Sequence, residues 1–392
     1  MSLLVVNTHP VQYQAPVYRA VQNEFGIPVK VMYGADFSVV GYHDREFQTE
    51  FAWDTPLVTE ADDLVFLSRV ANGGAREFSE VTAAGMSAEF DKISPDAVLI
   101  NGYAPAFHRA AFWQAYRRRL PILFRAETMD QEGNANWRTE TRSALLRLFY
   151  GCCKRVLPIG KLSRQHYAAR GVPERKMVFS PYCVDASTFS LEPAQRKDLR
   201  AATRRAEQIP ERAVVLLFSG KLNTRKDPVR VVEAVRLLPD ELRRQAVVMF
   251  LGEGTERQAV EAAARREPAV EIRLVGFKNQ RQLSAYYHAS DVLILPSHQE
   301  TWGLVVNEAM HHGLPCIVSD RVGSGPDLVH QDVTGGVARA GDATSFAAQL
   351  QRLWGPIAQG QLSEACRRVV AGYSVEAAAE GVAVAYRQVV RP

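Results

Sequence analysis

The chain has 392 residues, of which 47% are hydrophobic and 23% are charged, a balance typical of folded globular proteins and too apolar for intrinsic disorder. This length excludes a single small domain and corresponds to two or three domains. The formal net charge is only +4, from 47 basic and 43 acidic side chains, so we expect no nucleic-acid partner.

The cysteine pattern and the first residues indicate the cellular location of the protein. The five cysteines are odd in number and contain no C-x-x-C pair, so we expect no disulfide framework, no zinc site and a cytoplasmic protein. The start, MSLLVVNTHP, has no basic segment and a short apolar run, and no later run approaches the roughly 18 apolar residues of a membrane span. We therefore expect neither secretion nor a transmembrane helix.

The first half of the chain alternates short apolar runs with segments of helical length. Runs that are apolar on both faces and alternate with helices predict a parallel sheet of the α/β class. The predicted strands are residues 3–6, 29–33, 97–100, 122–124, 156–159 and 177–179.

The same pattern restarts after residue 189. Each apolar run is again followed by a helical stretch, so we predict a second doubly wound domain, joined to the first through residues 180–189. Two Rossmann-like domains imply a cleft, with ligands bound beyond the carboxyl ends of the strands. The predicted strands are residues 214–218, 247–251, 272–275, 292–295 and 316–318.

The strongest motif is SHQETWGLVVNEAM, which follows the strand at 292–295. Glu300 lies in the loop, whereas Glu308 falls in the second turn of a helix that begins near Gly303. Helical rise separates the two carboxylates by on the order of 10 Å, a spacing that suits two hydroxyl-bearing rings joined by a diphosphate. The backbone N–H groups of Gly303 and Leu304 would face the anion between them.

The second motif is SGKLNTRKDP, which follows the strand at 214–218. Gly220 allows close approach at the strand end, and Lys221 and Lys226 offer cations where a phosphate would bind. The spacing differs from that of a P-loop, and no G-x-G-x-x-G occurs.

Together these motifs resemble retaining glycosyltransferases of family 4, which have the GT-B fold. The resemblance is close over about residues 156–345. It rests on four ordered motifs, which here are Gly220-Lys221-Leu222 with Lys226, Gly252-Glu253-Gly254, Val275-Gly276-Phe277, and Glu300 with Glu308-Ala309-Met310 and Gly313-Leu314-Pro315.

The resemblance implies roles for single residues. Lys221, where many members carry arginine, and Lys226 would hold the diphosphate of a nucleotide-sugar donor. Glu300 would bind hydroxyls of the sugar, Glu308 the ribose, and the backbone around Lys278 the base. Two lysines can replace a metal and no Asp-x-Asp triplet occurs, so we expect no metal and no cofactor besides the donor co-substrate.

The amino half departs from the family pattern. Its loop at residues 7–14 lacks the usual glycine pair, and Arg125-Ala126-Glu127 stands where many members carry a histidine. We take Arg125 and Glu127, with Lys226 and Glu300, as catalytic candidates. His9, Gln12 and His108 are acceptor or cleft candidates, although each histidine is more often structural at such positions.

Residues 138–176 carry ten Lys or Arg and two Glu, with apolar residues between them. One interpretation is peripheral contact with an anionic membrane surface or with a phosphorylated acceptor. The other is a solvated face, balanced by acidic stretches such as residues 44–63.

The sequence thus predicts an acceptor-binding domain at 1–185, a nucleotide-sugar-binding domain at 186–372, and a terminal helix at 373–392 that packs on the first domain. The predicted activity is retaining sugar transfer from a UDP sugar, or a GDP sugar, to a glycan or lipid-linked acceptor of the cell envelope. A nucleotide-sugar epimerase of the same fold and an inactive nucleotide-sugar-binding regulatory protein remain alternatives.

Overall fold

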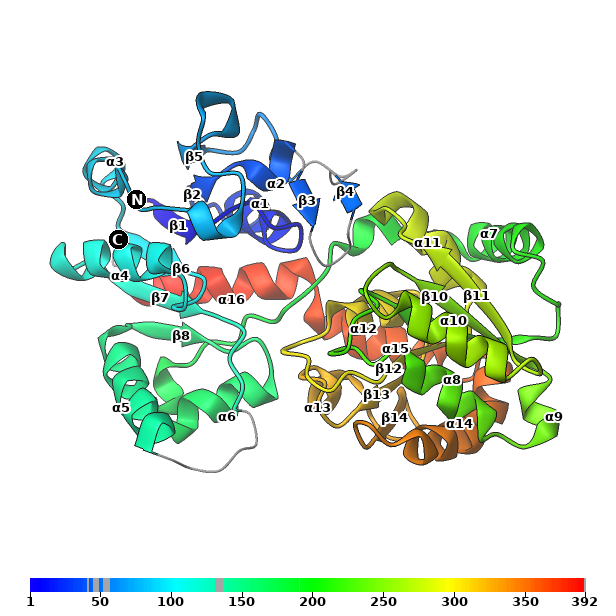
Figure 1. Ribbon diagram of the computed structural model, residues 1–392. Helices are drawn as coiled ribbons and strands as arrows, with labels where there is room; N and C mark the ends of the chain where they lie inside the picture. The colour runs from blue at the N-terminus through cyan, green and yellow to red at the C-terminus, as the bar shows by residue number, and fades with distance from the viewer. Residues whose placement is uncertain (41, 45–48, 52–56, 131–136, 190, 391–392) are drawn as a thin grey trace. The chain divides into compact units, whose positions relative to one another are not determined.

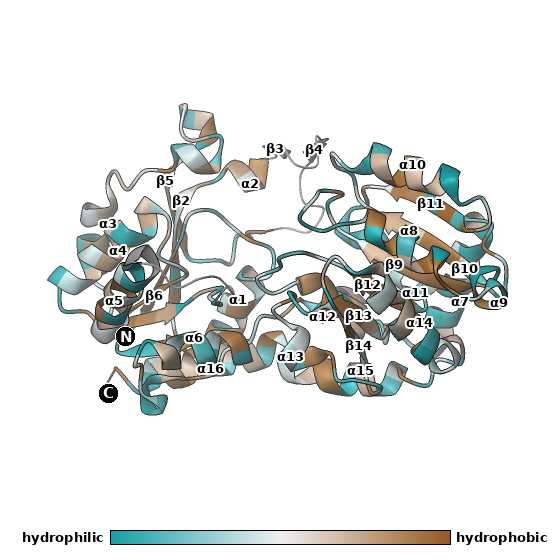
Figure 2. Ribbon diagram, turned by 60° about the horizontal axis from the view of Figure 1, so that its bottom comes forward, coloured by the Kyte–Doolittle hydropathy of each residue, from teal (hydrophilic) through white to brown (hydrophobic). Residues whose placement is uncertain are grey.

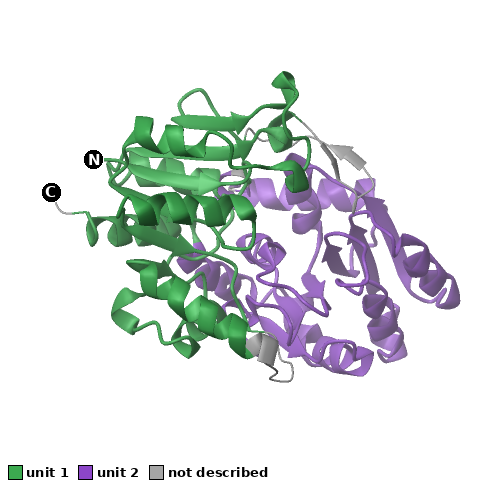
Figure 3. Cartoon of the chain, turned by 60° about the vertical axis from the view of Figure 1, so that its left-hand side comes forward, with its two compact units in different colours: residues 1–42, 50–185, 374–392 green, residues 43–49, 186–373 purple. Residues whose placement is uncertain are grey.

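The computed structural model describes residues 1–40, 42–44, 49–51, 57–130, 137–189 and 191–390. The chain divides into two compact units (Figure 3). Unit 1 comprises Met1–Tyr42, Glu50–Asp185 and Ser374–Pro392, and unit 2 comprises His43–Thr49 and Ala186–Tyr373.

Unit 1 is built on a six-stranded sheet in which every pairing is parallel (Figure 1). The strand order is β5-β2-β1-β6-β7-β8, so successive strands are added on one side of β1 and then, from β6 onward, on its other side. The strands are β1 (Leu3–Asn7), β2 (Val29–Ala35), β5 (Leu64–Ser68), β6 (Ala97–Ile100), β7 (Ile122–Arg125) and β8 (Arg155–Leu157). A separate two-stranded sheet pairs β3 (Tyr42–Asp44) with β4 (Thr49–Phe51).

Both faces of this sheet are covered because alternate strand residues belong to different cores. Leu3 and Val5 pack with helices α1 (Ala15–Asn23) and α16 (Val375–Arg387). Leu4 and Val6 pack with helices of the other face. Those helices are α3 (Met86–Ile93), α4 (Ala106–Arg117), α5 (Trp137–Cys152) and α6 (Lys161–Ala169). The carboxyl-terminal helix is therefore part of the first core.

Unit 2 repeats the topology, with the order β11-β10-β9-β12-β13-β14. Its strands are largely buried and appear brown in Figure 2, while the outer helix faces carry teal, hydrophilic residues. The strands are β9 (Val214–Ser219), β10 (Ala246–Leu251), β11 (Glu271–Gly276), β12 (Val292–Leu295), β13 (Cys316–Ser319) and β14 (Gly335–Ala338).

The larger helices of unit 2 form three contacting groups. Helix α8 contacts α10 and α14, whereas α7 contacts α11, and α12 contacts α15. The helices are α7 (Pro193–Ala206), α8 (Val229–Arg236), α9 (Asp240–Arg243), α10 (Arg257–Arg266), α11 (Gln280–Ala289), α12 (Leu304–His311), α13 (Gly325–Leu328), α14 (Ala343–Ala358) and α15 (Ser363–Val370); the short α2 (Phe37–Val40) belongs to unit 1.

The predicted fold class is confirmed, because both units are doubly wound parallel sheets of the Rossmann order. Several details of the strands differ from the prediction, which also lacked the short β3 and β4. Residues 177–179 form no strand: Met177 makes a single bridge to Val156, although Val178 N–H donates to the carbonyl of Val156 and Ser180 N–H to that of Pro158. Strands β5 and β14 were not predicted, since β5 is only half-buried and β14 begins with two glycines.

Candidate functional site

Two loops of unit 2 flank its topological switch point. At this point strands β9 and β12 lie side by side, and the chain continues from them toward opposite edges of the sheet. Residues 220–227 follow β9 and residues 296–303 follow β12. Ligands of doubly wound sheets bind at this position. The two motifs singled out in the sequence therefore meet at the expected edge.

The loop after β9 is fixed by the Gly252-Glu253-Gly254 motif. Gly220 N–H donates to the carbonyl of Leu251 and Leu222 N–H to that of Glu253. A Cβ atom on Gly252 would lie 2.0 Å from the carbonyl oxygen of Gly220, so only glycine permits this approach. The motif thus supports the lysine loop rather than contributing side chains to it.

A turn after Gly220 places the Lys226 side chain against the loop that follows β12. The Asn223 side-chain oxygen accepts from Lys226 N–H at 3.0 Å. The Nζ atom of Lys226 lies 2.6 Å from Oε2 of Glu300, and each side chain is only 12% exposed. The predicted phosphate-binding and sugar-binding residues therefore form one ion pair that joins the two loops.

Glu300 is itself held by the backbone of the segment before α13. Its N–H donates to the Arg321 carbonyl at 3.1 Å, and its carbonyl accepts from Gly323 N–H at 2.8 Å. This bridge fixes the main chain on both sides of the carboxylate. Glu300 is consequently placed by a rigid loop rather than by its own side-chain contacts alone.

Helix α12 begins at this loop, with Gly303 as the residue before its first turn. Gly303 adopts a left-handed φ of 90°, and a Cβ there would lie 3.1 Å from Cγ of Glu300. Within the described part of the chain, no hydrogen-bond acceptor is found for the N–H groups of Gly303 and Leu304. These groups can bind an anion at the helix start.

Glu308 lies in the second turn of α12 and is half-buried near the carboxyl ends of the unit 2 strands. Its Oε2 accepts from the Tyr287 hydroxyl at 2.7 Å, and that hydroxyl lies 3.2 Å from Oγ of Ser219. Burial raises the pKa of Glu308 above its usual range, against the opposing effects of the Tyr287 hydrogen bond and of Lys226. The carboxylate is thus a hydrogen-bond acceptor held in a poorly solvated position.

The remaining predicted donor residues lie on neighbouring loops. Lys221 is half-buried on the loop after β9. Lys278 follows β11 and places its Nζ 5.5 Å from the ring centre of Tyr286. The buried Trp302 donates its indole N–H to Asn307 at 2.9 Å, which fixes the loop against α12.

In unit 1 the corresponding switch point, between β1 and β6, brings His9 and His108 near each other. His108 is 6% exposed, and neither of its ring nitrogens has a hydrogen-bond partner among the described residues. Burial lowers the pKa of His9 to about 4, and burial followed by repulsion from His9 lowers that of His108 to about 4. Both are neutral imidazoles at pH 7.

The other candidates of unit 1 lie in different settings. Arg125 is 2% exposed and donates to the carbonyls of Ser180 and Pro181, with its guanidinium over the Tyr182 ring. These contacts hold the chain where it leaves unit 1. Glu127 accepts from the Tyr13 hydroxyl at 3.3 Å. Gln12 is half-buried. Catalytic or acceptor roles for Arg125, Glu127 and Gln12 stay predictions.

Sequence reasoning missed the residues that support the site. Tyr287, Ser219 and Asn223 each fix a functional group by a hydrogen bond. Asn223 carries a recognisable signal, because asparagine side chains in loops readily accept hydrogen bonds from nearby backbone N–H groups. Tyr287 carries none, since its contact with Glu308 depends on how α11 packs against α12.

Among the residues that the structure describes, no group of three or more His, Cys, Asp or Glu side chains is arranged to hold a metal ion. In the same residues, helices that combine the length and the apolar character of a membrane span are absent. The metal-free and peripheral-membrane expectations stay predictions.

The comparisons with known proteins agree with this geometry. Residues 200–355 match the family model of glycosyl transferases group 1. D-inositol 3-phosphate glycosyltransferase of Geodermatophilus obscurus is 33% identical over 292 residues, which cover 70% of this chain and 63% of that protein. Sulfoquinovosyl transferase of Arabidopsis thaliana is 27% identical over 243 residues, 61% of this chain and 44% of that protein. The chain thus spans less than two thirds of these relatives.

Solved structures match over nearly the whole chain. HepE from Anabaena, in complex with UDP, superposes with a TM-score of 0.72 at 14% identity, over 99% of this chain and 100% of that chain. Sucrose-phosphate synthase from Thermosynechococcus elongatus gives 0.69 at 18% identity, over 99% of both. At these identities the similarity shows the fold alone.

The fold and the matched sequence are similar to those of glycosyltransferases, a class of transferase enzymes. The chain carries a glycosyl transferases group 1 domain and has the GT-B fold.

Proposed function

We propose that the protein transfers a sugar from a nucleoside-diphosphate sugar, UDP being favoured, to an acceptor with retention of anomeric configuration. The Lys226–Glu300 ion pair at the unit 2 switch point carries this proposal. It supplies a cation for a phosphate and, beside it, a carboxylate for sugar hydroxyls. The helix start at Gly303 adds N–H donors for the same anion.

The charge requirement of the reaction fits this site. When the donor bond breaks, negative charge develops on the β-phosphate. A cation 4 Å from that oxygen contributes about 4 kcal/mol at an effective dielectric constant near 20, against about 1 kcal/mol in water. Any part realised only in the transition state raises the rate, about tenfold for each 1.4 kcal/mol.

Glu308 completes the proposed donor site. We assign it to the ribose hydroxyls, because the Tyr287 hydrogen bond orients its carboxylate and leaves acceptor capacity on the other oxygen. The backbone around Lys278 is assigned to the base.

The proposed chemistry is attack on the same face from which the nucleoside diphosphate leaves. The bond from acceptor oxygen to anomeric carbon forms, the bond from anomeric carbon to phosphate oxygen breaks, and the acceptor proton passes to the leaving phosphate. This course is preferred because no carboxylate among the candidates is assigned as a covalent nucleophile.

We assign acceptor binding to unit 1, with His9 and His108 as the candidate contacts. A glycan or lipid-linked acceptor of the cell envelope remains the proposal. The relatives named for D-inositol 3-phosphate and for sulfoquinovosyl transfer support widening it to phosphorylated polyols and lipids. Peripheral contact with an anionic membrane through α5 belongs to the same proposal, since Leu145 and Leu148 are 62% and 70% exposed.

The test is turnover of a panel of nucleotide sugars with and without acceptors. Transfer is supported by acceptor-dependent release of nucleoside diphosphate and a product with the anomeric configuration of the donor. Formation of an epimeric sugar without any acceptor would instead establish the epimerase alternative. Binding of the donor with neither reaction would favour a regulatory protein.

A further inference from the structure

A cavity of about 370 Å³ lies in unit 2 at the opposite strand ends from the candidate donor site. Ser290 and Asp291 line it directly before β12, and Gly313 to Pro315 line it directly before β13. Because Lys226 and Glu300 follow the carboxyl ends of β9 and β12, this cavity is separate from them. Neither the sequence motifs nor the proposed function assigns it a role.

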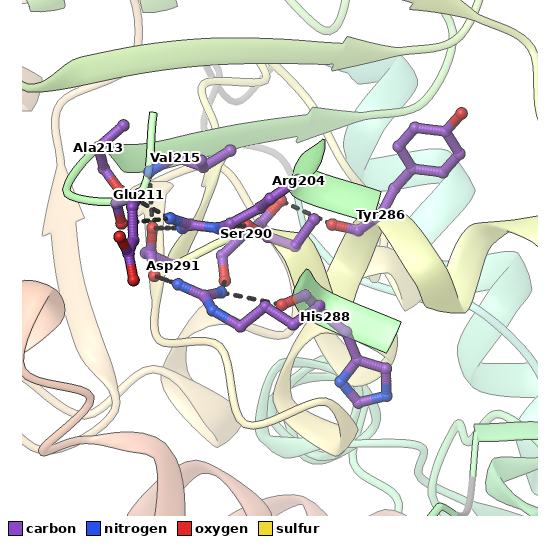
Figure 4. Close-up of polar contacts among 10 residues, drawn as sticks. Arg204, Glu211, Ala213, Val215, Tyr286, His288, Ser290 and Asp291 are labelled. Carbon is purple, nitrogen blue, oxygen red and sulfur yellow. Dashed lines mark hydrogen bonds and ion pairs between the residues drawn. The ribbon is translucent and has the colours of Figure 1, made fainter. Parts of the chain in front are cut away.

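One wall of the cavity is an ion-pair cluster that joins α7 to the start of β12 (Figure 4). Arg200 donates to the carbonyls of His288 and Ser290 and to Oδ1 of Asp291, at 2.9, 2.8 and 2.6 Å. Arg204 and the N–H of Val215 both donate to Oδ2 of Asp291, at 2.6 and 2.7 Å. The single acidic side chain of the cavity wall is therefore saturated by its own partners.

The other charges of the wall are positive. Arg196 and Lys197 on α7 and Arg367 on α15 line the cavity, and within the described residues none of the three forms an ion pair. Arg196 donates its Nε to the Leu191 carbonyl, and Arg367 donates one terminal nitrogen to the His312 carbonyl. Arg196 and Arg367 thus have only neutral carbonyl partners, and Lys197 adds a third cation to the wall.

The positive charges of this wall disfavour further protonation of the groups among them. Burial and then Arg196 lower the pKa of Arg367, and Glu364 opposes this shift without forming an ion pair. Burial lowers the pKa of His288 to about 4, with Arg196, Arg367 and Arg200 adding to the effect. The cavity therefore has a positive potential that its own carboxylates do not cancel.

A buried, unpartnered polar group also faces this cavity. His288 is 8% exposed and lines the cavity, and its Nε2 atom has no hydrogen-bond partner among the described residues. In Figure 4 its imidazole ring points away from the ion-pair cluster. The Nε atom of Arg367 is likewise buried without a partner. His288 and Arg367 thus add polar side chains to the cavity wall.

We propose that this cavity binds a phosphate-bearing small molecule, with Arg196, Lys197 and Arg367 contacting the phosphate and His288 contacting the same ligand. Guanidinium groups match the oxygens of a phosphate by paired, charge-assisted hydrogen bonds. The volume falls within the range of small-molecule sites and exceeds what one phosphate ion fills. The ligand class is therefore a phosphate ester, with free phosphate as the minimal form.

The test is calorimetric titration of the full chain with inorganic phosphate, up to about 10 mM at constant ionic strength. The donor site also attracts phosphate, so the titration is repeated with Lys226→Ala. The pocket variant is Arg196→Gln with Lys197→Gln, and the matched control is Arg265→Gln with Arg266→Gln, an equal charge loss at the exposed end of α10. The unfolding midpoint without phosphate checks each variant.

We expect one phosphate site that persists in Lys226→Ala, weakens by about tenfold or more in the pocket variant, and changes less than about twofold in the control. If the pocket variant does not fold, Arg367→Gln takes its place. Tighter binding of ribose 5-phosphate than of phosphate identifies an ester as the ligand, and equal binding identifies free phosphate. Absence of binding, loss in Lys226→Ala, or equal weakening by the control pair would overturn the proposal.

Discussion

Nζ of Lys226 lies 2.6 Å from Oε2 of Glu300, and this contact joins the loops that follow β9 and β12. Both side chains are nearly excluded from solvent, and the contact orients the Glu300 carboxylate. A ligand phosphate near Lys226 would therefore place its sugar beside Glu300.

The two carboxylates of the site are predicted to act at different stages. Glu300→Ala should lower turnover of the sugar donor at least about tenfold and leave the affinity for free UDP within about twofold. Glu308→Ala should weaken both, because only Glu308 is assigned to the ribose. The readouts are kcat for the donor and calorimetric Kd for UDP. An equal loss of UDP affinity in both variants would show that the assignment is wrong.

Tyr287→Phe is predicted to weaken UDP binding through Glu308. The substitution removes one hydrogen bond to the carboxylate, worth about 0.5–1.5 kcal/mol, or roughly a 2- to 12-fold increase in Kd. Tyr286→Phe is the matched control, since the Tyr286 hydroxyl donates to Glu207 instead. A similar effect of both variants on the UDP Kd would argue against a specific role for Tyr287.

UDP affinity is predicted to fall on acidification from neutral pH. Because the pKa of Glu308 is raised in the folded chain, the carboxylate becomes protonated at a higher pH than an exposed glutamate. A protonated carboxyl accepts hydrogen bonds from ribose hydroxyls less well, so binding should weaken as the pH falls through the raised pKa. Glu308→Gln should lose this component while keeping the titration of UDP itself. An unchanged profile in Glu308→Gln would contradict the assignment.

The buried histidines predict loss of stability in acid. The pKa of His108 is lowered to about 4 from an ordinary value of 6.5, so between these values the unfolded chain binds more protons than the folded one. The stabilisation is thus fully present above pH 6.5 and is lost as the pH falls toward and through 4. Denaturant unfolding at pH 7 and pH 5 should show a smaller difference in His108→Leu than in wild type. An equal difference in both would exclude His108 as a source.

Helix α5 is predicted to mediate binding to anionic vesicles. Each basic residue near such a surface contributes about 1 kcal/mol, screened over about 10 Å in 0.1 M salt, and the exposed Leu145 and Leu148 add apolar contact. The chain should sediment with anionic but not neutral vesicles at low salt, and Leu145→Ser with Leu148→Ser should reduce this. Leu237→Ser, an exposed leucine of unit 2, is the control. If neither added salt nor the double variant changed the sedimentation, α5 would not be the membrane-binding element. Its basic residues would then form an ordinary solvated face.

The fold was predictable because fully buried strands produce continuous apolar runs, as in residues 214–218. The edge strands were harder to predict from the sequence. In β14, a Cβ atom on Gly335 would lie 1.8 Å from the carbonyl oxygen of Cys316, so the position requires glycine. Glycine does not favour strands, and the sequence therefore gives no indication of β14. Residues 177–179 show the reverse case, an apolar run that makes only one bridge.

The site was predictable where a motif and a strand end coincide, as for Lys226, Glu300 and Glu308. The partners from other elements were not, because Tyr287 reaches Glu308 only through helix packing. Arg125 shows the limit of position alone: it ends β7 as predicted for a site residue, yet its guanidinium is bonded to the backbone carbonyls of Ser180 and Pro181. The basic cavity before β12 and β13 combines residues from α7, α11 and α15, and no local motif marks it.

The most direct measurement of the central claim is calorimetric titration of UDP, in the presence of EDTA, into wild type and Lys226→Ala. The account predicts one binding site in wild type that persists in EDTA and weakens by about tenfold or more in the variant. GDP, ADP and CDP are titrated in parallel to identify the base. No binding of any of the four, binding that EDTA abolishes, or equal affinity in Lys226→Ala would contradict a metal-independent nucleoside-diphosphate site at the Lys226–Glu300 pair.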